Sequence, residues 1–189
     1  LRVTREEFEN LQIGGRNLLT QSSVSGYGAT VNGYVYTLTK TPSSGNPYVR
    51  IPHTLFENDT EYVITFKARK ISGNVYRLAG HSTLIRQETV RLFIDGIEQT
   101  HKLINGWSSV GTANFPDDNE VHRYEIRFKT VSDVASVDTP YWYIQPNRPQ
   151  YDSDSFVLEI WDWKLEKGNK ATDWTPAPED VDERIDGAI

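Results

Sequence analysis

Aromatic rings and planar polar groups are the most informative side chains of this sequence, because together they suit contact with carbohydrate. The 189 residues include 5 Trp and 10 Tyr. Sugars offer apolar faces that stack on aromatic rings, and hydroxyls that bond to Asn, Asp, Gln and Arg. The first candidates for sugar contact are Trp161, Tyr141, Tyr143, Arg91, Asp95 and Gln145. A second group, in predicted loops at the rim of the fold, is Trp107, Tyr151, Tyr27 and Tyr48.

The first group follows from alternation along predicted strands. Side chains at every second position of a strand share one face, so apolar residues at alternate positions mark the side that faces the core. The apolar positions of Phe156–Ile160 form such a face, and Trp161 then lies on the opposite one. A β-bulge near Asp162 would return Trp163 and Leu165 to the core.

The other candidates come from two further alternating runs. In residues 140–145 we place Trp142 and Ile144 toward the core, and in residues 90–94 the even-numbered positions are apolar. The side chains left on the outer faces are Tyr141, Tyr143, Gln145, Arg91, Phe93 and Asp95. Three rings on one sheet surface exceed what solubility favours, so we expect those of Trp161, Tyr141 and Tyr143 to form one platform. Packing is the alternative explanation, because Tyr and Trp are often half-buried.

The predicted strands occupy the middle of the chain, from Asn17 to Trp174. Alternating runs recur at residues 34–39, 61–67, 90–95, 123–128 and 156–161, with shorter strands expected at 48–51, 75–78 and 142–144. Clusters of Gly, Pro, Asn and Asp separate the runs. Many short strands with one apolar face predict an all-β fold, an antiparallel β-sandwich, and their number and length suit a jelly roll.

Both ends of the chain carry helix signals. A capping box formed by Thr4 and Glu7 predicts a helix in residues 1–13. A second helix, with proline in its first turn, is expected in residues 177–189. The β-sandwich domain would then span residues 14–176, between two helical connectors. The sequence contains no Met, which is the pattern of a segment cut from a longer protein.

Composition and motifs argue against several functions. The formal net charge of −6 disfavours a nucleic-acid partner, and no apolar run is long enough to span a membrane. The absence of Cys excludes thiol catalysis and cysteine–zinc sites. The four histidines, at positions 53, 81, 101 and 122, lack metal-ligand spacing, and there is no nucleophile elbow or Gly-rich phosphate loop. We therefore predict that the protein is not an enzyme; a glycan hydrolase or an endopeptidase is the alternative.

Two motifs frame the predicted sandwich. They read GGRNLL at residues 14–19 and KLEKGNKATDWTPAPED at residues 164–180. Both resemble the edges of a carbohydrate-binding module that occurs in tail proteins of phages infecting Gram-positive bacteria. Those proteins include distal tail, tail-associated, accessory baseplate and receptor-binding proteins. The resemblance covers the edges alone, since residues 20–160 match no motif of that family.

The resemblance implies a galactose-binding-like jelly roll that binds carbohydrate without catalysis. The implied partner is host cell-wall polysaccharide, bound during adhesion by a virion protein of the phage tail at the outside of the bacterium. The flanking helices would contact other tail subunits. No cofactor is implied except a structural calcium ion, for which Asp162 and Glu166 would supply oxygens. The alternative function is a structural spacer or protein-docking domain of the tail or baseplate.

The framing motifs also have structural roles of their own. We expect Leu18–Leu19 to begin the first strand, and Trp163 and Leu165 to end the last one. Gly168 would then break that strand, and Trp174 would fold back as an apolar plug under the chain exit. The most recognisable residues are therefore expected to hold the fold rather than the ligand.

Overall fold

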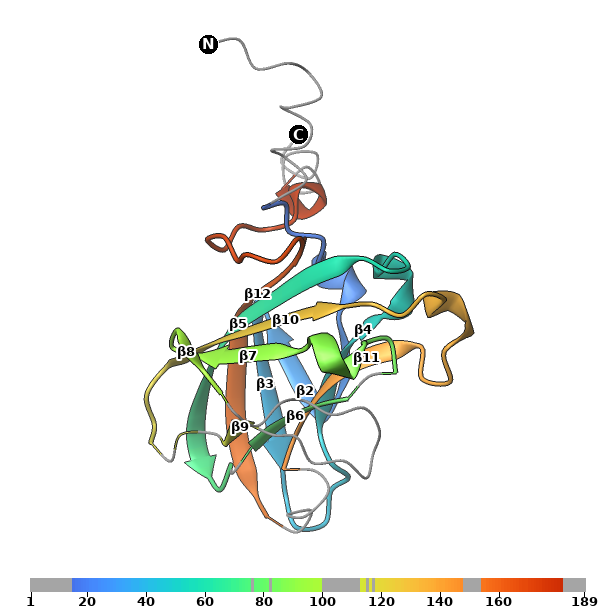
Figure 1. The fold of residues 1–189 in the computed structure, drawn as a ribbon. Helices are drawn as coiled ribbons and strands as arrows, with labels where there is room; N and C mark the ends of the chain where they lie inside the picture. Colours follow the sequence, from blue (N-terminus) through green and yellow to red (C-terminus); the bar gives the residue numbers. More distant parts are fainter. Residues whose placement is uncertain are drawn as a thin grey trace, which may run out of the picture.

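Strands are the main regular structure of the described chain and make two sheets (Figure 1). The computed structural model describes residues 15–75, 77–81, 83–99, 113–114, 116, 118–147 and 154–181. Within these ranges the strand pairs run antiparallel. The predicted all-β, antiparallel sandwich is therefore confirmed.

The two sheets differ in size. The five-stranded sheet contains, in spatial order, β1 (Ser25–Tyr27), β4 (Tyr48–Pro52), β11 (Tyr141–Pro146), β6 (Arg77–His81) and β9 (Ala113–Asn114). The seven-stranded sheet contains β2 (Ala29–Asn32), β3 (Val35–Lys40), β12 (Phe156–Lys167), β5 (Glu61–Gly73), β10 (His122–Lys129), β7 (Arg91–Ile94) and β8 (Ile97–Glu98). Short 3₁₀ turns lie at Gln21–Ser23, His53–Leu55, Gln87–Thr89 and Val134–Ser136.

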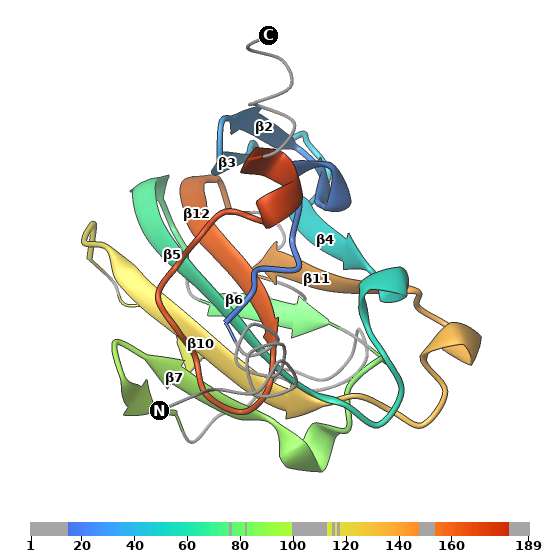
Figure 2. The same cartoon turned by 90° about the horizontal axis from the view of Figure 1, so that it is seen from above.

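Eight of these strands follow the connectivity of a jelly roll. β3, β12, β5 and β10 are neighbours in one sheet, and β4, β11, β6 and β9 are neighbours in the other. Successive strands of this set therefore cross from sheet to sheet, except for β6 and β9, which pair with each other. Figure 2 shows the two layers from above. The jelly roll predicted from strand number and length is confirmed by this order.

Aromatic rings in the core link the two sheets. Trp142 of β11 and Trp163 of β12 are buried, and their ring centroids are 6.3 Å apart. The Trp163 ring also lies 5.8 Å from Tyr36 and 6.0 Å from Phe66. Phe66 in turn stacks on Tyr124 at 5.0 Å. Such pairs add about 0.5–1.5 kcal/mol each beyond burial, so this seam helps to hold the layers together.

A β-bulge in β12 places Trp163 in the seam. The pairing of β12 with β5 shifts register between Trp161 and Lys164, and Asp162 has a φ of 51°. The apolar positions before the bulge face the core, and Trp163 and Leu165 do so after it. The predicted return of these two side chains to the core is confirmed.

Asn17 joins the two ends of the sandwich. Its buried side-chain amide donates to the backbone carbonyls of Trp163 at 3.0 Å and Thr175 at 2.9 Å. Its carbonyl oxygen accepts from the backbone N–H of Leu19 at 3.0 Å and of Leu165 at 3.2 Å. One side chain thus satisfies four backbone groups at the two ends of the sandwich, and this is a structural role.

Two other framing residues lie as predicted. β12 ends directly before Gly168, which has a φ of 112°. Trp174 folds back over the last strand, where its Nε1 donates to the carbonyl of Trp163 at 3.1 Å. Its ring meets Tyr34 edge-on at 5.3 Å.

The prediction that Leu18–Leu19 begin the first strand is wrong. The Leu18 N–H does donate to the carbonyl of Leu165 at 2.8 Å, but the first strand starts at Ser25. The hydrogen bond from Leu19 to the Asn17 side chain competes with strand pairing, and the chain continues into the 3₁₀ turn at Gln21–Ser23.

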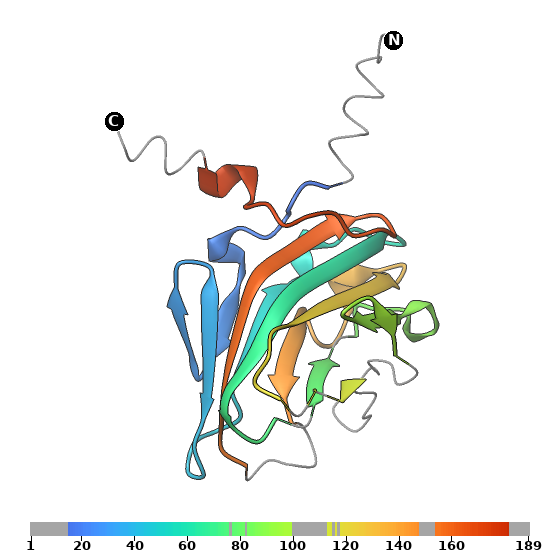
Figure 3. The same ribbon diagram turned by 90° about the vertical axis from the view of Figure 1, so that its left-hand side faces the viewer.

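Both described chain ends leave from the same end of the sandwich (Figure 3). Arg16 forms an ion pair with Glu179. Residues 178–181 are helical, as predicted, whereas the helix expected in residues 1–13 lies outside the described residues. In the described part, no helix has the length and apolar character needed to cross a membrane.

Residues beyond the predicted domain boundary also pack on the sandwich. Ala177 and Asp180 are buried, and both carboxylate oxygens of Asp180 accept from the Gln21 N–H at 3.2 Å. The boundary at residue 176 stays a prediction, and we propose that the folded unit extends to Asp180.

We expect Asn17→Ala to lower the free energy of unfolding by about 3 kcal/mol, because buried backbone groups lose their partners. Chemical denaturation measures this, with Asn32→Ala as the matched control, since Asn32 is exposed beside the β2–β3 turn. An equal, small loss in both variants would contradict the assigned role of Asn17.

Candidate functional site

Tyrosines gather on the outer face of the five-stranded sheet. In β11, Trp142 and Ile144 are buried toward the core, so Tyr141, Tyr143 and Gln145 point outward as predicted. In β4, Val49 and Ile51 are fully buried, which leaves Tyr48 and Arg50 on the same outer face. β1 adds Tyr27 directly opposite Tyr48. We call Tyr27, Tyr48, Tyr141, Tyr143 and Arg50 the tyrosine face.

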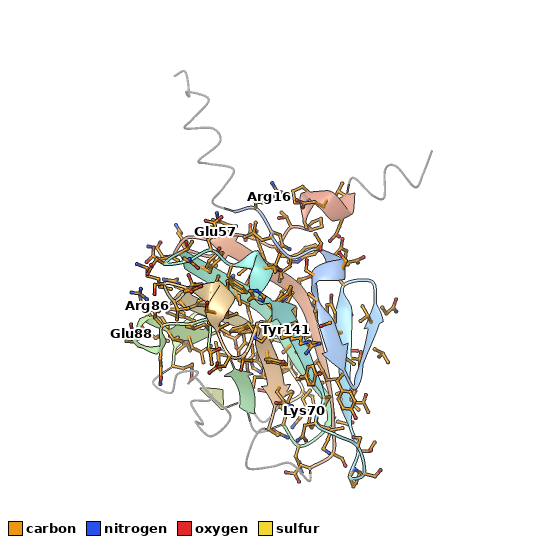
Figure 4. All side chains as sticks on the ribbon, turned by 90° about the vertical axis from the view of Figure 1, so that its right-hand side faces the viewer. Arg16, Glu57, Lys70, Arg86, Glu88 and Tyr141 are labelled. Carbon is orange, nitrogen blue, oxygen red and sulfur yellow. The ribbon has the colours of Figure 1, made fainter. Side chains whose placement is uncertain are left out.

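The four rings of the tyrosine face form a continuous line. Tyr27 stacks on Tyr48 with centroids 5.9 Å apart, and Tyr48 meets Tyr143 edge-on at 5.3 Å. Tyr143 then meets Tyr141 at 5.9 Å. These separations are those of favourable aromatic pairs, so the line is held by its own contacts. Figure 4 labels Tyr141 and views the molecule from the side opposite to Figure 3.

Arg50 lies at the centre of the tyrosine face and fixes its rings. Its guanidinium carbon is 3.9 Å from the centroid of Tyr141, and 5.7 Å and 5.9 Å from those of Tyr48 and Tyr143. It donates to the Tyr143 hydroxyl at 3.3 Å and to the Ser25 hydroxyl at 3.0 Å. The bond to Tyr143 raises the pKa of Arg50, against the opposing effect of burial. A permanent cation therefore holds the rings in place.

The members of the tyrosine face differ in exposure. Tyr27 is 51% exposed, Tyr48 and Tyr141 are partly exposed, and Tyr143 is 9% exposed. The first three present ring surface to solvent, whereas Tyr143 is buried and packs against the rings of Tyr48 and Tyr141. Gln145, a predicted contact, is buried and donates to the carbonyl of Asn46 at 3.4 Å. We therefore assign Gln145 to support of the neighbouring loop.

Three predicted contact residues lie on the other sheet. Trp161 is partly buried on the outer face of β12, opposite Lys67 of β5, and Arg91 and Asp95 belong to β7 and the turn after it. The prediction that Trp161, Tyr141 and Tyr143 share one surface is therefore wrong. Alternation fixes which side of a strand faces the core, but the jelly-roll crossover sends β11 and β12 to different sheets.

The predicted rim group is divided as well. Tyr27 and Tyr48 lie on strands rather than in loops, and they join the tyrosine face. Trp107 and Tyr151 lie outside the described residues. Sequence reasoning missed Arg50, although its place between Val49 and Ile51 in a predicted strand puts it on the outer face.

The carboxylates considered for calcium have other partners. Both oxygens of buried Glu166 accept from Thr172, and the Lys164 ammonium lies 3.4 Å away. Asp162 pairs with Lys67 at 3.0 Å. An ammonium beside Glu166 repels a cation, so this donor set does not fit calcium. Among the described residues, no three acidic or histidine side chains gather as a metal site.

Asp95, a predicted sugar contact, belongs to a structural cluster. It lies in the β7–β8 turn with a φ of 51°, where its carboxylate accepts from the Arg123 N–H at 2.8 Å. His122 Nδ1 lies 2.6 Å from Asp95, and His122 Nε2 lies 2.7 Å from Asp118. An imidazolium donates from both nitrogens, so the cluster favours charged His122.

The pKa values of this cluster shift together. Burial lowers the pKa of His122, but its bonds with Asp95 and Asp118 outweigh burial and raise it above 6.5. The bond from His122 lowers the pKa of Asp118 below 3.8. Burial raises the pKa of Asp95, but bonds from His122 and the Arg123 N–H bring it below 3.8.

We expect the cluster to stabilise the fold most in mildly acidic solution. The raised pKa of His122 gives stability that is complete below 6.5 and lost as pH rises through the folded-state value. The lowered pKa values of the carboxylates give stability that is complete above 3.8 and lost as pH falls through theirs. The difference in melting temperature between wild type and His122→Gln should therefore be largest near about pH 5.5 and shrink by about pH 8.5. His53→Gln is the control, and a difference for His122→Gln that is constant with pH would contradict the cluster.

Comparisons with known proteins give remote structural likenesses. No protein-family model and no curated protein matches the chain. The tripod from the baseplate of bacteriophage Tuc2009 aligns at a TM-score of 0.48 and 18% identity, over 89% of this chain. This chain spans 61% of that one. The N-terminal cellulose-binding domain of Cellulomonas fimi β-1,4-glucanase C aligns at 0.44 and 12% identity, over 84% of this chain and 98% of that one. A CBM4 structure aligns at a TM-score of 0.40 and 14% identity, over 78% of this chain and 96% of that one. Likenesses at this level do not assign the chain to a family.

Proposed function

We propose that this chain is a non-catalytic carbohydrate-binding module of a phage tail or baseplate protein, which adheres to host cell-wall polysaccharide at the outside of the bacterium. The observation that carries the proposal is the tyrosine face, a line of four rings around one arginine on the outer face of one sheet. The phage context rests on the framing motifs at residues 14–19 and 164–180.

The tyrosine face suits an extended glycan. Its exposed rings come from three strands, β1, β4 and β11, and can stack on the apolar faces of successive sugars. The ring contacts and the Arg50 hydrogen bonds fix the side chains before a ligand arrives, so little rotamer entropy is lost on binding. Binding at a single site of this kind is weak, and several copies on one tail would raise it through avidity.

The chemistry of the tyrosine face favours binding over hydrolysis. Its five members are tyrosines and an arginine, whereas most glycosidases flank the scissile bond with two carboxylates. The phenol and guanidinium groups donate to sugar hydroxyls but do not supply that acid–base pair. Protein docking is the second candidate, because exposed Tyr and Arg are also enriched where proteins bind each other.

We expect Tyr48→Ala and Tyr141→Ala each to weaken binding to cell-wall polysaccharide roughly tenfold, because each removes a stacking ring. The measurement is titration of the full chain with purified wall polysaccharides from a panel of Gram-positive bacteria. Trp161→Ala is the matched control, an outward aromatic on the opposite sheet, and it should keep wild-type affinity.

The same panel separates the alternatives. Loss of binding in Trp161→Ala, with Tyr48→Ala unaffected, would move the site to the seven-stranded sheet. If wild type binds no polysaccharide of the panel, the carbohydrate proposal fails and protein docking becomes the leading function. Release of soluble sugar on prolonged incubation would overturn the non-catalytic assignment.

A further inference from the structure

A cationic pocket lies on the seven-stranded sheet, at the end where β12 runs into the turn at 168–170. Its volume is about 630 Å³, which falls within the roughly 300–1,000 Å³ of small-molecule sites. Four of its lining side chains are basic and one is acidic; these are Arg91, Arg127, Lys129, Lys170 and Glu61. The whole chain carries a net charge of −6, so this concentration of positive charge is local.

Two arginines face each other across strands in this pocket. Arg127 of β10 is the register partner of Arg91 in β7. Like charges directly opposite each other destabilise a sheet. The Phe93 ring lies beside both, 4.6 Å from the guanidinium carbon of Arg127 and 5.2 Å from that of Arg91. The face of the ring attracts both cations.

Carboxylates hold these arginines from one side. Glu98 accepts from Arg91 Nε at 3.0 Å and from Nη2 at 2.8 Å. Glu125 accepts from Arg127 Nε at 2.6 Å. In the part of the chain that the structure describes, both terminal nitrogens of Arg127 lack a hydrogen-bond acceptor. An arginine positioned by one edge presents its other donors as a fork, the geometry that matches an oxyanion.

The two lysines of the pocket add further cationic groups. Lys129 lies next to Arg127 on the same outer face of β10, and Lys170 belongs to the turn that walls the pocket. Within the described residues, neither ammonium forms a hydrogen bond or an ion pair. Three side chains from two separate segments therefore offer unused donors to the same space.

We propose that this pocket is a second ligand site, which binds an oxyanion group, phosphate or carboxylate. An anion in the pocket accepts from Arg127, Lys129 and Lys170, whose donors the carboxylates of Glu98 and Glu125 leave unused. The site lies on the opposite sheet from the tyrosine face, so it does not depend on the proposed function.

The test is titration of the full chain at low ionic strength with inorganic phosphate, glycerol 3-phosphate and glucuronate, followed by amide chemical shifts. Glycerol and glucose are the neutral probes. We expect Arg127→Gln and Lys129→Gln each to weaken binding of the charged probes roughly tenfold. Arg123→Gln is the matched control, because Arg123 pairs with the same Glu125 but lies outside the pocket.

The outcomes are distinct. The site is supported if Arg127→Gln loses binding of the charged probes while Arg123→Gln and Tyr48→Ala keep it. This holds whether phosphate or carboxylate binds better. Equal loss in Arg123→Gln and Arg127→Gln would show a general effect of net charge and overturn it. Absence of saturable shifts with every charged probe, or equal binding of glucose, would also overturn it.

Discussion

At Asp162 the backbone of β12 turns to a φ of 51°, and its register against β5 shifts between Trp161 and Lys164. Without this bulge, strict alternation after Ile160 would send Trp163 outward. Because of it, Trp163 fills the space between the sheets, where it meets Trp142 of the opposite layer. The carbonyl of the same residue accepts from Asn17 and Trp174, so the closure of both chain ends depends on the bulge too.

The tyrosine face follows from this core. Trp142 is fully buried against the Trp163 seam, and that burial turns its neighbours Tyr141 and Tyr143 outward. The pairing of β11 with β4 then places Arg50 directly opposite Tyr143. The rings are therefore ordered from within the protein, and the ligand does not need to arrange them. A rigid scaffold with a preorganised surface is what a binding module requires.

Local patterns predicted the strands and their inward faces well, because burial imposes a period of two. The alternation of Phe156–Ile160 and the bulge after it are seen in the structure. Such patterns could not predict which sheet each strand joins. Trp161 and Tyr143 lie in strands with equally clear alternation, but the two strands belong to opposite sheets. The hydrogen bond between Asp95 and His122 was also beyond such patterns, because the two residues are 27 positions apart in sequence. Tyr27 and Tyr48 were predicted in rim loops, but pairing of β1 with β4 makes them neighbours on the face of a sheet.

We propose that carbohydrate binds along the tyrosine face. The decisive measurement is a titration of the wild-type chain with a fragment of a wall polysaccharide that it binds. The backbone amide shifts that change during the titration map the binding surface. We expect the perturbed amides to cluster on β1, β4 and β11, around Tyr27, Tyr48, Arg50 and Tyr141. Perturbations centred instead on β5 and β12 around Trp161, with these strands unaffected, would contradict it.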